Sequence, residues 1–87
     1  METRIALVGI MLENKESTPK LNAILHEYAD YIIGRMGIPH ARDGMSVISI
    51  VMDAPESVTS ALAGKVGMLP FVSVTTMYSK TAACRPC

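Results

Sequence analysis

The sequence predicts a small α+β domain in which two strand–helix–strand units share one antiparallel sheet. The runs at 4–12 and 45–52 are apolar at both alternating sets of positions, whereas the stretch ending at Arg42 and the stretch at 71–78 are mixed. Strands that are apolar on both faces lie at the centre of a sheet, and mixed strands lie at its edges. The order strand, helix, strand, strand, helix, strand is that of the ferredoxin-like fold. The expected class is therefore α+β, ferredoxin-like βαββαβ, with a four-stranded antiparallel sheet and two helices on one face.

The length of the chain allows one domain with one modest core. Of the 87 residues, 49% are hydrophobic and only four are aromatic, so aliphatic residues and the seven methionines must form that core. The domain is expected to span 1–80, with a flexible tail at 81–87. An apolar fraction this high on a small domain suggests that part of the surface is buried in a homodimer or a higher homo-oligomer.

Charge and hydropathy exclude several classes of function. Eight basic and eight acidic residues cancel without forming a block, so direct nucleic-acid binding is not expected. No stretch approaches the ~20 apolar residues of a membrane span, and no cleavage-site pattern follows the N-terminus, so a cytoplasmic location is expected. Nucleophile–base signatures and glycine-rich phosphate loops are absent from the sequence, which argues against an enzyme.

The first helix is expected to begin at Ser17 or Thr18, either of which can act as N-cap, with Pro19 at the first helical position. Apolar residues then recur at helical spacing: Leu21, Ile24, Leu25, Tyr28, Ala29 and Ile32. The opposite side is polar and includes Asn22 and His26. The pattern predicts an amphipathic helix of three to four turns that packs on one face.

The stretch at 31–39 combines glycine, a fixed positive charge and proline within apolar sequence. Gly34 is predicted to end the first helix, because a helix C-terminus often needs a residue that tolerates positive φ. Gly37 is predicted to mark a bulge or a close backbone approach in the second strand. Arg35 lies between them, and its planar guanidinium suits a carboxylate or a phosphate. The alternative is that both glycines serve the backbone alone and Arg35 is solvated.

The second half of the chain repeats the pattern of the first. Asp43 and Gly44 are predicted to form a two-residue hairpin turn before the strand at 45–52. Asp53 or Ala54 is expected near the cap of the second helix, with Pro55 in its first turn. The helix is expected to end near one of two glycines, at positions 64 and 67, before the edge strand at 71–78.

The sequence also resembles a known family. The residues that carry the resemblance lie at 1–10, 21–28, 31–39 and 53–55, and the likeness extends to about Lys80. They are similar to small ACT-like proteins described as regulators of the iron-only ([FeFe]) hydrogenase system. The resemblance implies an ACT-like domain similar to the ligand-sensing half of nickel-responsive repressors, found alongside the hydrogenase maturation machinery. The DNA-binding arm of those repressors has no counterpart ahead of the first strand, so a regulatory effect is expected to need a partner.

ACT-like domains bind ligands where protomers meet, so the resemblance implies a ligand site near the glycine-containing stretch. The expected ligand-binding residues are Gly34, Arg35, Met36, Gly37, Ile38 and Pro39. The expected function is a non-enzymatic, dimeric module that senses a small molecule or a metal, with no cofactor identified. The alternative is a docking module that dimerises and binds another protein without any ligand.

Two cysteines lie near the C-terminus in a C-x-x-C arrangement. Cys84 and Cys87 supply two thiolates, whereas a structural zinc or iron–sulfur site needs four ligands, so two tails would have to meet across a dimer. The alternative is a mobile tail without a metal. His26 and His40 lack further ligands at metal-site spacing and are expected to be solvated.

Overall fold

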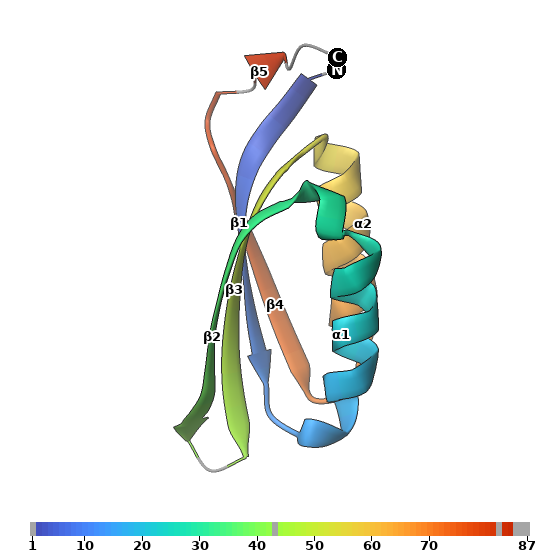
Figure 1. Ribbon diagram of the computed structural model, residues 1–87, viewed down its shortest axis with the longest axis vertical. Helices are drawn as coiled ribbons and strands as arrows, with labels where there is room; N and C mark the ends of the chain where they lie inside the picture. Colours follow the sequence, from blue (N-terminus) through green and yellow to red (C-terminus); the bar gives the residue numbers. More distant parts are fainter. Residues whose placement is uncertain (1, 43, 82, 85–87) are drawn as a thin grey trace.

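The computed structural model describes residues 2–42, 44–81 and 83–84. The described residues form five strands and two α-helices, with short 3₁₀ turns on either side of the first helix. Figure 1 shows their arrangement. The elements in chain order are β1 (Glu2–Leu12), η1 (Lys15–Ser17), α1 (Thr18–Glu27), η2 (Ala29–Tyr31), β2 (Ile32–Arg42), β3 (Met45–Ala54), α2 (Glu56–Gly67), β4 (Val72–Tyr78) and β5 (Ala83–Cys84).

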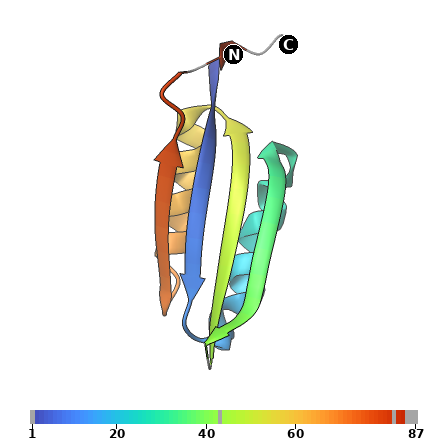
Figure 2. The ribbon, with the colours of Figure 1, turned by 90° about the vertical axis from the view of Figure 1, so that its left-hand side faces the viewer.

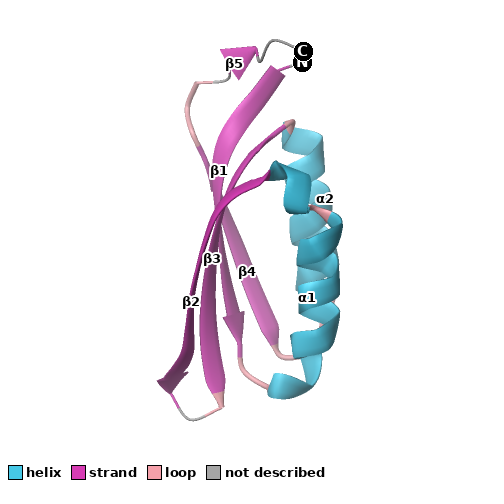
Figure 3. Cartoon of the chain, viewed as in Figure 1, coloured by secondary structure: helices cyan, strands magenta, loops and turns pink. Residues whose placement is uncertain are grey.

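The main sheet has the strand order β2-β3-β1-β4, and every neighbouring pair is antiparallel. Strands β1 and β3 are therefore central and β2 and β4 lie at the edges. Both helices cover the same face of the sheet (Figure 3). The predicted ferredoxin-like βαββαβ class is confirmed. The sequence did not predict β5, which pairs with the first residues of β1 beyond the end of the main sheet.

The core lies between the sheet and the two helices. Its fully buried side chains come from alternate residues of the central strands and from one stripe on each helix: Val8, Ile10, Leu12, Leu21, Leu25, Ile50, Met52, Ala54, Leu62 and Val66. Burying a large aliphatic side chain of this kind contributes about 1.5–3 kcal/mol. This apolar layer fixes the distance between α1 and the edge strand β2, where the candidate site lies.

The central strands are apolar on both faces, as predicted, but in the single chain only the face toward the helices is buried. Alternate residues of β1 point away from the helices and are exposed, with Leu7 at 41% and Met11 at 50%. Figure 2 shows that face of the sheet with no helix in front of it. The strand is apolar at both sets of positions because one set forms the core and the other forms an uncovered apolar face.

The first helix is shorter than predicted. It ends at Glu27, a 3₁₀ turn follows, and Ile32 already pairs with Met52 in the sheet. Gly34 does not end the helix, and it lies in β2 opposite Val51, beside an irregularity in the strand register. The β-branched residues at 32 and 33 have a high propensity for strands, although the apolar pattern also allows a helix there. Pairing with β3 places them in a strand. Gly37 pairs regularly with Ile48, so no bulge falls on it.

The helix starts were predicted at nearly the right residues with the wrong cap chemistry. Ser17 is the N-cap of α1, but its Oγ donates to the carbonyl oxygen of Pro70 at 2.8 Å rather than capping the helix. Pro55, rather than either of the two residues before it, is the N-cap of α2. Two residues join β2 to β3 as predicted. Gly44 has φ +71°, and Asp43 lies outside the described residues.

Candidate functional site

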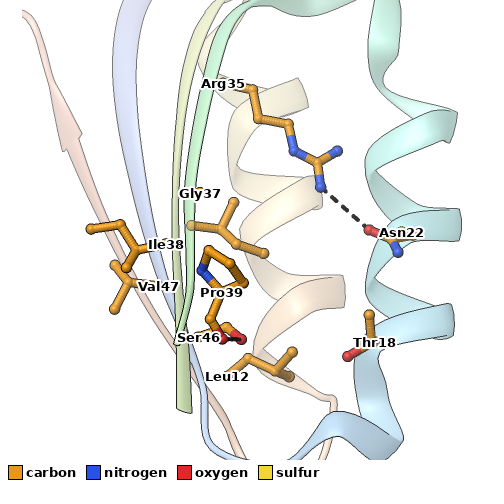
Figure 4. A pocket seen from close by; sticks show the side chains of 10 residues that line it. Leu12, Thr18, Asn22, Arg35, Gly37, Ile38, Pro39, Ser46 and Val47 are labelled. Carbon is orange, nitrogen blue, oxygen red and sulfur yellow. Dashed lines mark hydrogen bonds between the residues drawn. The ribbon is translucent and has the colours of Figure 1, made fainter. Parts of the chain in front are cut away.

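A groove of about 260 Å³ runs between the first half of α1 and the edge strand β2. Thr18 and Asn22, one helical turn apart on α1, face Arg35 and Pro39 across it (Figure 4). The residues that line the groove are Leu12, Thr18, Asn22, Arg35, Gly37, Ile38, Pro39, Ser46, Val47 and Ile48. Most of these are apolar, and a few polar groups come from the helix and from the strands, as in a small-molecule pocket.

Arg35 is the charged side chain of the groove. It pairs with the buried residue Ile50 in the sheet, so it points toward the helices rather than toward the uncovered face. Its Nη2 donates to Oδ1 of Asn22 at 3.4 Å, which is long for a hydrogen bond. In the part of the chain that the structure describes, Arg35 has no carboxylate partner. Most of its donors are therefore free to receive a ligand.

Gly37 keeps the groove open. It lies on the same side of β2 as Arg35, two residues further along, opposite Ile48. A Cβ placed on Gly37 would lie 3.9 Å from the carbonyl oxygen of Val47, which is an ordinary contact. The backbone thus tolerates a side chain here, and the absence of one leaves the space to the groove.

A second hollow of about 360 Å³ adjoins the first on the other side of Arg35. Its lining includes Leu25, His26 and Ile32, and it shares Asn22 and Arg35 with the groove. The two side chains that form the hydrogen bond therefore line both hollows. His26 is therefore next to Arg35, a position that the helical pattern alone did not reveal.

The predicted ligand-binding residues divide between two faces of β2. Arg35, Gly37, Ile38 and Pro39 line the groove, although the side chain of Ile38 points away from α1 in Figure 4. Gly34 and Met36 do not line it, because their register places them on the uncovered face. That all six bind one ligand stays a prediction, and four of them are brought together.

Asn22 is the hydrogen-bond partner of Arg35 in the groove, and the sequence did not single it out as a site residue. It was placed only on the polar side of the first helix. The spacing of Thr18, Asn22 and His26, four residues apart each time, is the signal that could have identified one polar edge of the helix. Which strand that edge faces depends on how the helix packs, and the spacing alone does not give it.

The uncovered face of the main sheet, which we call the bare sheet face, consists of three central rows of residues that are neighbours across the strands. The first row is Gly34, Val51, Leu7 and Met77; the second is Met36, Ser49, Gly9 and Thr75; the third is Ile38, Val47, Met11 and Ser73. No charged residue lies in these rows. The exposed fractions of Met36 and Met77 are 65% and 64%. Small residues in the middle row separate two apolar ridges, a surface that a partner can pack against.

The metal prediction for the cysteines is not tested. Cys84 contributes backbone to β5, and Cys87 lies outside the described residues. Among the described side chains, no group of three or more His, Cys, Asp or Glu residues could hold a metal ion. Over the same residues, none of the helices has the length and apolar character needed to cross a membrane.

An ion pair joins the two helices on their outer side. Nζ of Lys65 lies 2.7 Å from Oε1 of Glu27 and 5.1 Å from the ring centre of Tyr28. The hydrogen bonds to Glu27 and to Tyr28 raise the pKa of Lys65 above the usual lysine value. This cluster is exposed and stabilises the helix pair only weakly, so it has no part in the groove.

The strand order and helix placement define the class of the protein as a ferredoxin-like α+β domain, here with a groove beside an edge strand. Residues 4–76 match the family described as "TM1266-like: Iron-only hydrogenase system regulator, putative", and the chain belongs to this family. The resemblance noted in the sequence is thereby confirmed. A comparison with the curated proteins gives no match.

Solved structures support the fold. The chain is similar to the uncharacterized protein TM1266 from Thermotoga maritima, with 26% identity and a TM-score of 0.84, over 90% of this chain and 99% of that one. It is also similar to part of a formyltetrahydrofolate deformylase from Pseudomonas putida KT2440, with 11% identity and a TM-score of 0.59. That match covers 84% of this chain and 28% of the deformylase chain, and it shows the fold alone.

Proposed function

We propose that this protein is a non-enzymatic regulatory module of the iron-only hydrogenase system that dimerises and senses a small effector. The family membership supports the regulatory role and the system in which it acts. The bare sheet face supports dimerisation, because an apolar surface of this kind is stabilised when a second copy covers it.

One observation carries the proposal: a single strand, β2, contributes to both surfaces. Arg35 and Gly37 face the groove, while the residues that alternate with them, Met36 and Ile38, lie on the bare sheet face. Alternate residues of a strand point to opposite faces. An effector that shifts β2 from the groove side therefore moves residues of the dimer contact, which couples binding to assembly.

Pairing of two β2 edges is the less favourable mode of dimerisation. Pro39 has no backbone N–H to donate, and the register of β2 is irregular between Ile32 and Gly34 and again between Ile38 and Arg42. Irregular edges and proline oppose edge-to-edge pairing. The bare sheet face offers a regular surface instead, so we place the dimer contact there.

Sedimentation velocity tests the dimer. Leu7 lies in a central strand within the bare sheet face, so Leu7→Glu places two charges in the contact and is expected to give a monomer that retains its circular dichroism spectrum. Met68→Glu is the control, because Met68 is 85% exposed and follows α2, away from the bare sheet face. A wild-type chain that sediments as a monomer contradicts the proposal, as does a Leu7→Glu dimer.

Docking of another protein is the second candidate function. It is favoured by Met68 and Phe71, both exposed at the connection between α2 and β4. Two large apolar side chains at one loop resemble the anchor residues of a protein interface. In this case Met68→Glu would weaken binding of the regulated protein while the dimer stays intact.

A further inference from the structure

We propose that the effector bound in the groove is a small carboxylate with an apolar body, which takes the place of the Asn22 amide oxygen on the guanidinium of Arg35. The inference rests on the proposed sensing function and names the class of ligand. The charge, the lining and the size of the groove each support it.

The groove and the adjoining hollow together contain one fixed positive charge. Arg35 is the only side chain with a fixed charge among the residues that line the two hollows. A guanidinium binds a carboxylate with two parallel N–H···O bonds, and one positive charge balances one carboxylate. A phosphate monoester carries up to two charges and would leave one without a counter-ion. Asn22 already offers one neutral oxygen at 3.4 Å, and a charged oxygen makes the stronger bond.

The lining next to Arg35 suits an apolar body. Leu12 and Ile48 contribute aliphatic surface from the central strands, and Pro39 contributes its ring from β2. Gly37 leaves the space above this surface empty. A ligand with a branched hydrocarbon part can therefore bury it there while its carboxylate reaches Arg35.

The size of the site limits the ligand. Pockets for drug-sized ligands measure about 300–1,000 Å³, and the groove, at about 260 Å³, lies just below that range. The ligand is accordingly a small acid rather than a nucleotide or a peptide.

An NMR titration of the ¹⁵N-labelled full chain tests this inference, with 3-methylbutanoate as the probe. We expect saturable shifts of the Gly37 amide and of the Asn22 side-chain amide. 3-Methylbutanamide has the same shape without the charge, and acetate has the charge without the body. Both are expected to bind at least about tenfold more weakly, a factor that corresponds to losing one charge-assisted bond or a few buried methyl and methylene groups. Inorganic phosphate that binds as tightly as the probe overturns the carboxylate assignment.

Two variants locate the site. Asn22→Asp places a carboxylate of the chain itself opposite Arg35 and is expected to abolish binding of the probe without changing the fold, because Asn22 is exposed and the side chains have the same shape. Gly37→Val fills the groove at a position where a Cβ fits the backbone, and it is expected to weaken binding at least about tenfold. Ala61→Val is the matched control, since Ala61 is exposed on α2 and lies neither in the groove nor on the bare sheet face. Wild-type affinity in Asn22→Asp overturns the inference.

The two proposals fail separately. If the chain dimerises through the bare sheet face but does not bind 3-methylbutanoate, the proposed ligand class is wrong and the proposed dimer contact still holds. If the chain binds the probe in the groove but sediments as a monomer, the proposed dimer is wrong and the proposed ligand class still holds.

Discussion

Ser17 is a buried hydroxyl that joins two distant parts of the chain. Its Oγ donates to Pro70 at 2.8 Å, and the neighbouring carbonyl, that of Phe71, accepts from the backbone N–H of Glu13 at 2.8 Å. Together these bonds hold Phe71 at φ +61°, a left-handed conformation that costs a residue with a side chain about 1–2 kcal/mol. The loop before α1 therefore fixes the start of β4.

Ser17→Ala is expected to lower the free energy of unfolding by about 1 kcal/mol, because it removes the buried bond and leaves the Pro70 carbonyl without its donor. Urea unfolding followed by circular dichroism measures the change. Ser57→Ala, at an exposed position of α2, is the control and is expected to change the stability by less than about 0.5 kcal/mol. Equal effects of the two substitutions would show that the Ser17 hydroxyl does not hold the loop.

At the same scale, an anion site at Arg35 stays a prediction from the sequence, and the sequence did not give the hydrogen-bond partner of Arg35. A guanidinium between glycines indicates an anion site from the residue types alone. Asn22 lies opposite it only because α1 packs against the sheet beside β2, and no pattern within residues 31–39 contains that information. Ser17 shows the same limit: an N-cap was predicted from its type, but its hydroxyl bonds a residue far along the chain.

Among the elements, α2 and the β2–β3 turn each contain a glycine with free space around it. A Cβ on Gly64 or on Gly44 would meet no atom within 4 Å, so packing does not distinguish them. Their backbones do, because Gly64 lies within a helix while Gly44 has φ +71°.

Gly64→Ala is expected to raise the free energy of unfolding by about 0.5–1 kcal/mol, the usual gain when a helix interior loses a glycine. Gly44→Ala is expected to lower it by about 1–2 kcal/mol, because alanine resists the left-handed conformation. Thermal and urea unfolding of both variants provides the comparison. If both substitutions stabilise the protein, the turn does not require positive φ.

The elements were largely predictable because their patterns are local. Continuous apolar runs identified β1 and β3, and mixed runs identified the edge strands. The end of α1 was not predictable, because residues 28–33 fit the apolar face of a helix and also contain two β-branched isoleucines suited to a strand. Pairing of Ile32 with Met52 settles the ambiguity, and such pairing is a tertiary contact.

On the scale of the whole molecule, the high apolar content of the chain is explained by two apolar layers rather than one. The core lies on the helix side of the sheet, and the bare sheet face lies on the other side. The runs that are apolar on both faces of the central strands predicted an apolar surface besides the core, but they did not predict the groove. Strand β2 connects the two sides, with Arg35 toward the helices and Met36 on the bare sheet face.

The central claim is that a second copy of the chain covers the bare sheet face. Isotope-filtered NMR on an equal mixture of ¹³C-labelled and unlabelled protein tests it most directly, because it detects contacts between chains alone. We expect intermolecular contacts among the side chains of Leu7, Val51 and Met77, which form one row of that face. Intermolecular contacts confined to the edge of β2 or to the helices, or none at all, would contradict the account.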